Sequence, residues 1–137
     1  MPDVNGVLET SLYVDDIGRA ARFYRTLFGF EPLEGDDRFA ALSVAGKQVL
    51  LLFRKGATIH PIPLPGGTIP PHEGTGSLHL AFSIPAAEWQ IWEEQLADQA
   101  IGIESVVSWP RGGSSLYFRD PDGHLIELVT PGCWKIY

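Results

Sequence analysis

The strongest constraint on the fold is that the chain passes twice through the same order of predicted elements. The first strand is expected in VLETSLYV, Val7 to Val14, which is rich in β-branched and aromatic residues. DDIGRAARFYRTLFG follows with apolar residues at helical spacing, which predicts a helix with an aspartate cap at its start and Gly29 at its end. A short strand near residues 30–33 and the strands RFAALSVAG and KQVLLLFRK, joined by a turn at Ala45-Gly46, complete this set.

The same order begins again after residue 77. SLHLAFSI predicts a strand, and PAAEWQIWEEQLADQA predicts a helix with Pro85 at its entry. A short strand near 103–108 and the strands SSLYFRD and HLIELVT, folded around the turn Asp120 to Gly123, follow. Each half therefore consists of a strand, a helix and about three antiparallel strands, which predicts an α+β fold built from two related modules.

A segment rich in proline and glycine separates the halves. Residues 56–77, GATIHPIPLPGGTIPPHEGTGS, are expected to form a long loop in which no regular element persists. We therefore predict a single domain with one module at about residues 5–55 and the other at about residues 78–131. His60 and His72 lie in this loop. We interpret them as surface histidines, although they could also cover a site or supply a proton.

Charge and cysteine content exclude several classes of partner. Ten basic residues against seventeen acidic ones give a formal net charge of -7, which disfavours nucleic acid or an anionic membrane as the main partner. No apolar run approaches the length that spans a bilayer, so we expect a soluble chain. Cys133 is the only cysteine and the N-terminal residues lack the features of a secretory signal, which predicts a cytoplasmic protein.

Three residues are candidate metal ligands. Aligning the first strands of the two halves places Glu9 over His79, and aligning the last hairpins places Glu127 at or near Leu50. Glu127 lies within an apolar strand, where an unpaired charge is costly, so it needs a partner. Two carboxylates and a neutral imidazole from separate strands suit a divalent cation. Taken singly, Glu9 could face solvent and His79 could be a core histidine.

These segments also carry a family resemblance. LETSLYVDDIGRAARFYRTLFGFEP, HLAFSI and LYFRDPDGHLIELVT together resemble the vicinal oxygen chelate superfamily, which includes glyoxalase I, bleomycin resistance proteins, fosfomycin-resistance enzymes and extradiol dioxygenases. The resemblance implies two βαβββ modules that form a curved mixed sheet around a metal. It implies that Glu9, His79 and Glu127 hold one divalent ion, which could be Mn, Fe, Zn, Ni or Mg. It also implies a homodimer with a small-molecule substrate.

The first module departs from the pattern of glyoxalase I. That enzyme commonly has a further ligand, a glutamate, on the last strand of its first module, where this chain has QVLLLF. A carboxylate there is central to the usual proton transfer, so lactoylglutathione lyase activity is doubtful for this chain. Glu9 also stands where fosfomycin enzymes and extradiol dioxygenases usually have histidine, which gives a harder ligand set.

Four further residues are candidates for substrate contact. Tyr117 resembles a tyrosine that fosfomycin-resistance enzymes place beside the substrate, and its phenol could donate to an oxyanion; it could equally be a half-buried strand residue. Trp109, Arg111 and Ser115 are expected in the wall of the site. Arg111 could anchor a carboxylate or phosphonate, or be solvated in its glycine-rich loop.

Three hypotheses about function follow. The first is a metal-dependent enzyme that chelates two adjacent oxygens of a small substrate and stabilises an oxyanion, with isomerase or lyase chemistry, epoxide opening and ring-cleaving dioxygenation all open. The alternative is a metal-independent protein of the bleomycin-resistance type that sequesters a ligand, although such proteins usually lack the ligand set. In a third, the three residues are relics on an interaction scaffold.

Overall fold

The helix after the first strand is fixed at both ends by its own residues. In the computed structural model, which describes residues 1–137, α1 (Ile17–Phe28) begins after Asp16, whose Oδ1 accepts a hydrogen bond of 3.0 Å from the backbone N–H of Arg19. Gly29 ends the helix at φ 71°, a left-handed conformation that glycine adopts without steric cost. Both caps agree with the sequence prediction, and the buried side chains of Tyr24 and Leu27 lie on the inner face of α1.

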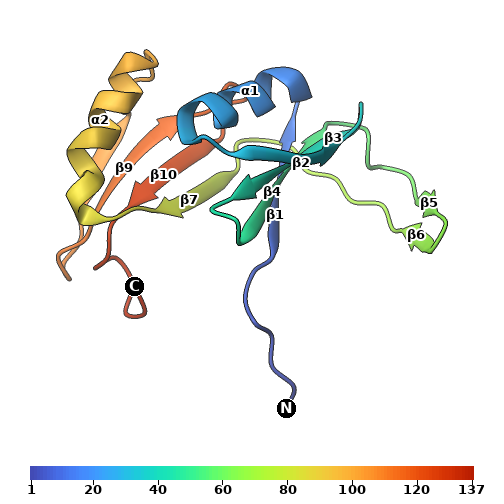
Figure 1. Ribbon diagram of the computed structural model, residues 1–137, viewed down its shortest axis with the longest axis horizontal. Helices are drawn as coiled ribbons and strands as arrows, with labels where there is room; N and C mark the ends of the chain where they lie inside the picture. The colour runs from blue at the N-terminus through green and yellow to red at the C-terminus, as the bar shows by residue number, and fades with distance from the viewer. The chain divides into compact units, whose positions relative to one another are not determined.

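The chain divides into two units, residues 1–75 and 76–137. The main elements of the first unit are β1 (Glu9–Val14), α1, β2 (Glu31–Gly35), β3 (Phe39–Val44) and β4 (Gln48–Arg54). The strands form a sheet in the order β1-β4-β3-β2, in which β1 is parallel to β4 and the other pairs are antiparallel (Figure 1). Ala45 and Gly46 both have positive φ, and the turn that they form between β3 and β4 is closed by a hydrogen bond of 3.1 Å from the Lys47 N–H to the Val44 oxygen.

The second unit repeats this arrangement. It contains β7 (His79–Ser83), the short 3₁₀ helix η1 (Ala86–Glu88), α2 (Trp89–Asp98), β8 (Ser105–Ser108), β9 (Ser114–Arg119) and β10 (Leu125–Val129). Its sheet has the order β7-β10-β9-β8, in which β7 is parallel to β10 and the other pairs are antiparallel (Figure 1). The predicted α+β class with two βαβββ modules is confirmed. Neither α1 nor α2 is long and apolar enough to cross a membrane.

Alternation along the strands gives each sheet one apolar and one more polar face. In β1, Leu12 and Val14 are buried, whereas Glu9 and Tyr13 lie on the opposite face with Ser11. In β10, Ile126 and Leu128 are fully buried on one face and Glu127 belongs to the other. The apolar faces make the core, together with buried residues of the helices: Ala20, Tyr24, Leu27 and Leu96.

The prediction that residues 56–77 contain no regular element is wrong in part. β5 (Ile62–Leu64) and β6 (Gly67–Ile69) form a two-stranded hairpin around Pro65 and Gly66, and it extends away from the four-stranded sheet of its own unit (Figure 1). Pro63 pairs with Thr68 within this ribbon. A proline is compatible with a ribbon of only two strands, because its missing N–H can face outward at the edge.

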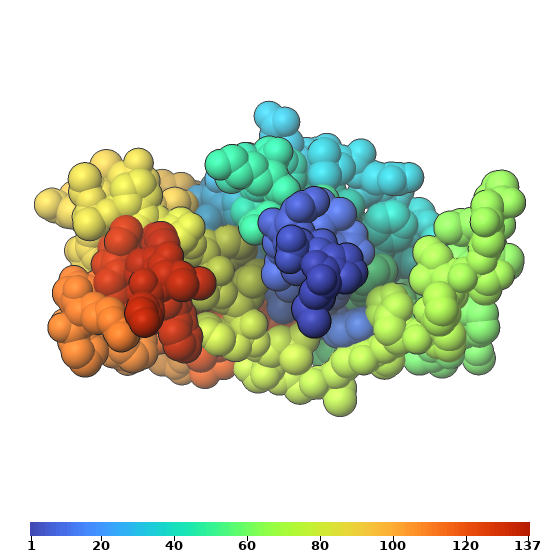
Figure 2. Space-filling view, turned by 90° about the horizontal axis from the view of Figure 1, so that it is seen from below, coloured from blue at the N-terminus to red at the C-terminus, as the bar shows by residue number.

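The N-terminal residues extend beyond the start of β1. Residues 1–8 have no regular structure, and they stand out in dark blue at the front of Figure 2. Val4, Val7 and Leu8 are consequently exposed in this chain.

We expect the α1 cap to contribute measurably to stability. Asp16→Ala removes the side-chain acceptor of the Arg19 N–H, and should lower the free energy of unfolding by about 1 kcal/mol, measured by urea denaturation. The matched control is Asp15→Ala, which removes a surface ion pair with Lys55 at 3.3 Å and should cost less than about 0.5 kcal/mol. Equal losses in the two variants would contradict the capping role.

Candidate metal centre

The carboxylate of Glu127 is buried and held from one side by a chain of donors. Its side chain is 8 % exposed, and its Oε2 accepts a hydrogen bond of 2.5 Å from Ser115 Oγ. Ser115 Oγ in turn accepts a hydrogen bond of 2.8 Å from Trp109 Nε1. Because an indole N–H can only donate, this contact leaves the Ser115 hydroxyl proton for Glu127. The two contacts orient the carboxylate and leave its other oxygen, Oε1, for a different partner.

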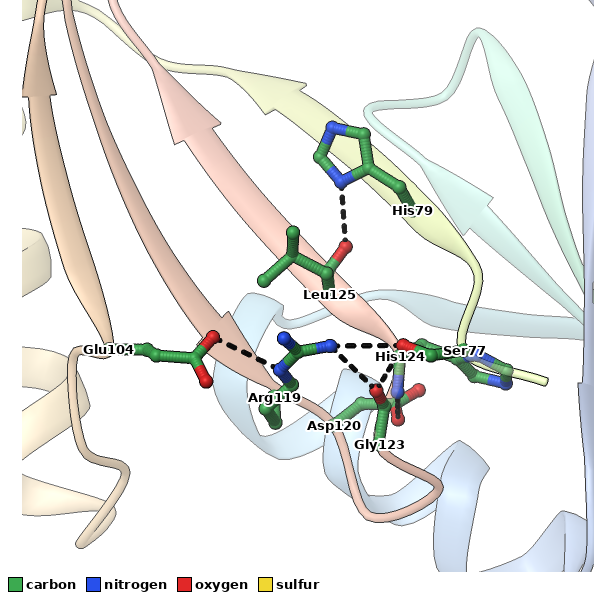
Figure 3. Close-up of polar contacts among 8 residues, drawn as sticks. All are labelled: Ser77, His79, Glu104, Arg119, Asp120, Gly123, His124 and Leu125. Carbon is green, nitrogen blue, oxygen red and sulfur yellow. Dashed lines mark hydrogen bonds and ion pairs between the residues drawn. The ribbon is translucent and has the colours of Figure 1, made fainter.

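That partner is His79, the first residue of β7. β7 runs parallel to β10, with His79 opposite Leu125, so its imidazole lies beside Glu127 two residues further on. His79 Nε2 is 3.2 Å from Glu127 Oε1, and His79 Nδ1 is 2.9 Å from the backbone oxygen of Leu125 (Figure 3 shows this second contact). A carbonyl can only accept, so Nδ1 carries a proton and donates it. About half of the His79 side chain is exposed, 49 %, so the pair is open to solvent on that side.

This arrangement is suited to a cation. With Nδ1 protonated, a neutral His79 directs the lone pair of Nε2 at a carboxylate oxygen, and two electron-rich atoms 3.2 Å apart repel each other. A proton on Nε2 or a metal ion bound by both groups removes the repulsion. Metal-binding histidines usually donate their other ring N–H to a carbonyl or carboxylate, as His79 does to Leu125. His79 and Glu127 therefore fit two positions of a divalent metal site.

Tyr117 faces the same carboxylate from the neighbouring strand. In the antiparallel pairing of β9 and β10, Tyr117 is directly opposite Glu127, and its ring centroid is 6.3 Å from that of His79. Burial of the phenol, followed by the negative charge of Glu127, raises the pKa of Tyr117 above its usual value. The hydroxyl therefore stays protonated at neutral pH and is available as a hydrogen-bond donor.

The turn between β9 and β10 fixes the start of β7 and with it His79. Asp120 Oδ1 accepts the backbone N–H groups of Asp122 and His124, each at 2.9 Å, as expected for a turn aspartate. His124 is buried, and its Nδ1 accepts the N–H of Leu78 at 3.0 Å. His124 thus links the turn to the residue before His79. This agrees with the prediction that it is not a metal ligand.

Arg119 adds a second link between the same segments. Its Nη1 donates to Ser77 Oγ at 2.9 Å and to the backbone oxygen of Gly123 at 3.1 Å, while its Nε donates to Glu104 at 3.1 Å (Figure 3). Ser77 itself donates to the same Gly123 oxygen at 2.7 Å. The loop that leads into β7 is therefore tied to the turn by side chains as well as by the sheet.

Glu9 belongs to the first unit and is the first residue of β1, as His79 is of β7. The predicted equivalence of the two positions is confirmed by strand register. Glu9 pairs with Val49 as His79 pairs with Leu125, so the equivalent of Glu127 is Leu51, one residue from the predicted Leu50. No group of three His, Cys, Asp or Glu side chains gathers within either unit. Metal binding by Glu9 stays a prediction.

The first unit has a cavity on the face of its sheet that carries Glu9. Its volume is about 720 Å³, and its walls come from the four strands and from the proline-rich loop. Leu51 lies in this wall where the second unit has Glu127. Tyr13 lies four residues after Glu9, on the same face of β1. Its hydroxyl forms a hydrogen bond of 2.7 Å with His72 Nδ1. The cavity and this pair were not found from the sequence.

A family model of the Glyoxalase/Bleomycin resistance protein/Dioxygenase superfamily matches residues 6–128. The chain belongs to this superfamily. The match confirms the predicted resemblance to the vicinal oxygen chelate proteins, and the repeated βαβββ order described above agrees with it.

Relatives within the superfamily include several enzymes. Metallothiol transferase FosB of Staphylococcus saprophyticus is 29% identical over 129 residues, 93% of this chain and 78% of the relative. Catechol-2,3-dioxygenase of Bacillus subtilis is 31% identical over 87% of this chain, which spans only 39% of that protein. The crystal structure of lactoylglutathione lyase from Agrobacterium tumefaciens is 31% identical with a TM-score of 0.87, covering 98% of this chain and 99% of that one.

The other residues with predicted roles are the candidates for substrate contact and the two histidines of the proline-rich loop. Trp109 and Ser115 are tied to Glu127 through the contacts given above, and Arg111 is exposed. Their roles in substrate binding stay predictions, as does a catalytic role for Tyr117. His60 is exposed, as expected of a surface histidine, whereas the same interpretation of His72 is wrong because His72 is half-buried against Tyr13. Alternation along β1 predicts that Tyr13 lies on the face of Glu9. It does not predict the contact of Tyr13 with His72, which is 59 residues away along the chain.

We expect Ser115 to be needed for the burial of Glu127. Ser115→Ala removes the donor to Glu127 and the acceptor of the Trp109 indole, both in a fully buried position. The free energy of unfolding from urea denaturation should fall by about 1–3 kcal/mol. Ser105→Ala, at an exposed position of β8, is the matched control and should leave stability within about 0.5 kcal/mol. A loss no larger than that of the control would contradict the proposed support.

Proposed function

We propose that this chain is a divalent-metal-dependent enzyme in which His79, Glu127 and Glu9 bind one cation beside a small substrate. The observation that carries the proposal is the His79–Glu127 pair at 3.2 Å, with the other imidazole nitrogen donating to the Leu125 carbonyl. Glu9 is included because it occupies in its module the position that His79 occupies in the other. Two carboxylates and one neutral imidazole would balance the charge of the ion.

The residues of the chain would divide the work between them. A bound divalent ion would supply Lewis acidity toward two adjacent oxygens of the substrate. Ser115 and Trp109 hold the Glu127 carboxylate in one orientation, so the ligand geometry would not depend on the metal alone. The protonated hydroxyl of Tyr117 would donate a hydrogen bond to the oxygen on which negative charge develops.

The residue at position 51 disfavours one of the candidate reactions. Lactoylglutathione lyase chemistry moves a proton between adjacent carbons and requires a base, and Leu51 occupies the place in the first module that Glu127 occupies in the second. The likeness to the Agrobacterium tumefaciens protein keeps that activity as a candidate. Thiol transfer and dioxygenation of a catechol, suggested by the metallothiol transferase and catechol dioxygenase relatives, do not require an acid at Leu51.

Sequestration of a ligand without metal is the second candidate. The cavity of the first unit favours it, since an apolar cavity can bind a ligand without assistance from a cation. The third hypothesis, that the three residues are relics, is disfavoured by Ser115 and Trp109, which support Glu127 as a working ligand would need. Cytoplasmic location and a homodimer remain proposals, the latter tested by light scattering during gel filtration.

Metal titration tests the proposal directly. Mn²⁺ added to chelator-treated protein should bind at one site per chain, measured by electron paramagnetic resonance of the free ion. Glu127→Gln and Glu9→Gln should each weaken binding by more than about tenfold, because even changes to groups that only support a ligand cost about 10–100-fold. Ser115→Ala should weaken Mn²⁺ binding by about 10–100-fold, because Ser115 supports the Glu127 carboxylate.

Glu104→Gln provides the matched control for these variants. Glu104 is an exposed carboxylate of the second unit paired with Arg119 at 3.1 Å, and its loss should leave Mn²⁺ affinity unchanged. Wild-type protein that binds no Mn, Fe, Ni or Zn would refute the metalloenzyme. If substitution of His79 or Glu127 abolishes Mn²⁺ binding but Glu9→Gln leaves the affinity unchanged, Glu9 is not a metal ligand.

Two assays then separate the reaction classes. Oxygen consumption with a panel of catechols, followed with an oxygen electrode and Fe²⁺-loaded protein, would assign dioxygenase chemistry. We expect no isomerisation of the hemithioacetal of methylglyoxal and glutathione, followed by absorbance, because Leu51 supplies no base. Turnover in the second assay would show that another group takes the proton.

A further inference from the structure

The cavity of the first unit has the size of a small-molecule site. Its volume of about 720 Å³ lies within the range of about 300–1,000 Å³ that is typical of ligand pockets. The sheet contributes mostly apolar and aromatic side chains to the wall, together with Glu9 and Glu34. Thr58, Ile62, Ile69, Pro70 and His72 close it from the loop.

Aromatic rings dominate one part of this wall. Phe53 is stacked on Tyr13 with ring centroids 6.0 Å apart, lies 6.1 Å from Phe39, and meets His72 edge-on at 4.7 Å. Leu51 and Val49 continue the surface along β4. A flat apolar ligand can make stacked or edge contacts with such a cluster, and each contact adds to the free energy of burying its surface.

The charges of the cavity disfavour an anion. Arg38 is its single basic side chain, and its Nη2 forms an ion pair of 2.9 Å with Asp36, which is reinforced by Nε at 3.3 Å. Glu9 and Glu34 contribute two negative charges, whereas the single arginine of the wall is already paired with Asp36. A phosphonate or carboxylate would therefore find no unpaired cation here and would meet two carboxylates.

The Tyr13–His72 pair is a polar contact within the wall, and the loop holds it in place. His72 N–H donates to the backbone oxygen of Thr58 at 3.0 Å, and Thr58 Oγ1 donates back to the oxygen of His72 at 2.5 Å. Gly74 packs so closely that an added Cβ would lie 2.5 Å from the Tyr13 ring. Burial, followed by the charge of Glu73, raises the pKa of Tyr13, so the phenol stays neutral.

We propose that this cavity binds the aromatic body of a neutral ligand, with a hydroxyl group of that ligand hydrogen-bonded to the Tyr13–His72 pair. A phenolic hydroxyl can donate to the Tyr13 oxygen while Tyr13 donates to His72. Glu9, a proposed metal ligand, also lines this cavity. The inference rests on the proposed function only where it identifies the bound ligand with the substrate of the enzyme. It separates this chain from relatives named for resistance to fosfomycin, a small phosphonate.

Binding of 2-naphthol to chelator-treated protein tests the inference without any metal. Its single hydroxyl cannot chelate, and its fluorescence anisotropy reports binding. We expect saturable binding, and binding of 1-propylphosphonate at least tenfold weaker by calorimetry. Ala41→Phe places a ring in the cavity and should weaken 2-naphthol binding at least tenfold. Ala97→Phe, at an exposed position of α2, is the matched control and should change nothing.

Tyr13→Phe tests the polar anchor while keeping the ring. It should weaken 2-naphthol by about three- to tenfold, the range expected for one hydrogen bond, and leave naphthalene binding unchanged. The control is Tyr137→Phe, which removes a hydroxyl that donates to backbone oxygens of Ile84 and Val129 in the second unit. An equal loss for naphthol and naphthalene would overturn the anchor.

The inference and the proposed function can fail separately. Failure of wild-type protein to bind 2-naphthol, or tighter binding of the phosphonate, overturns the inference even if Mn²⁺ binds normally. Ala41→Phe should retain a cooperative unfolding transition in urea, which shows that the variant is folded. Binding of 2-naphthol by a chain that takes up no metal would support the cavity and remove the metalloenzyme.

Discussion

A carboxylate buried in an apolar sheet must be matched by donors or by a cation, and Glu127 places this requirement on the whole second unit. Ser115, Trp109 and His79 meet it from three different segments. The parallel pairing of β7 with β10 brings His79 alongside, and the turn around Asp120 and His124 holds the start of β7 in register.

The two modules share one plan but use their open faces differently. Strand register makes Leu51 and Ala41 of the first unit the counterparts of Glu127 and Tyr117 in the second. One face therefore carries groups that can hold a cation, and the other lines an apolar cavity. Glu9 is the exception, because it retains a potential ligand at the position equivalent to His79. The two copies of the fold thus carry different side chains at equivalent positions of their open faces.

The parts predicted well were those that depend on local patterning. The helix caps at Asp16 and Gly29, the turn at Ala45-Gly46 and the alternation that places Glu127 opposite Ile126 and Leu128 are set by neighbours in sequence. The β5–β6 hairpin was missed because proline argues against strands in general but permits an edge in a two-stranded ribbon. His72 was misjudged because its partner, Tyr13, is remote in sequence.

The sequence by itself determined the family, the α+β class, the repeated order of elements and the three candidate ligands, because period, caps and turns are encoded within short segments. Only the tertiary structure decided that His79 Nδ1 donates to a carbonyl, that Ser115 and Trp109 orient Glu127, and that a cavity faces Glu9. These facts depend on strand register and on loops returning to a sheet. Such pairings join residues tens of positions apart, and no local pattern specifies them.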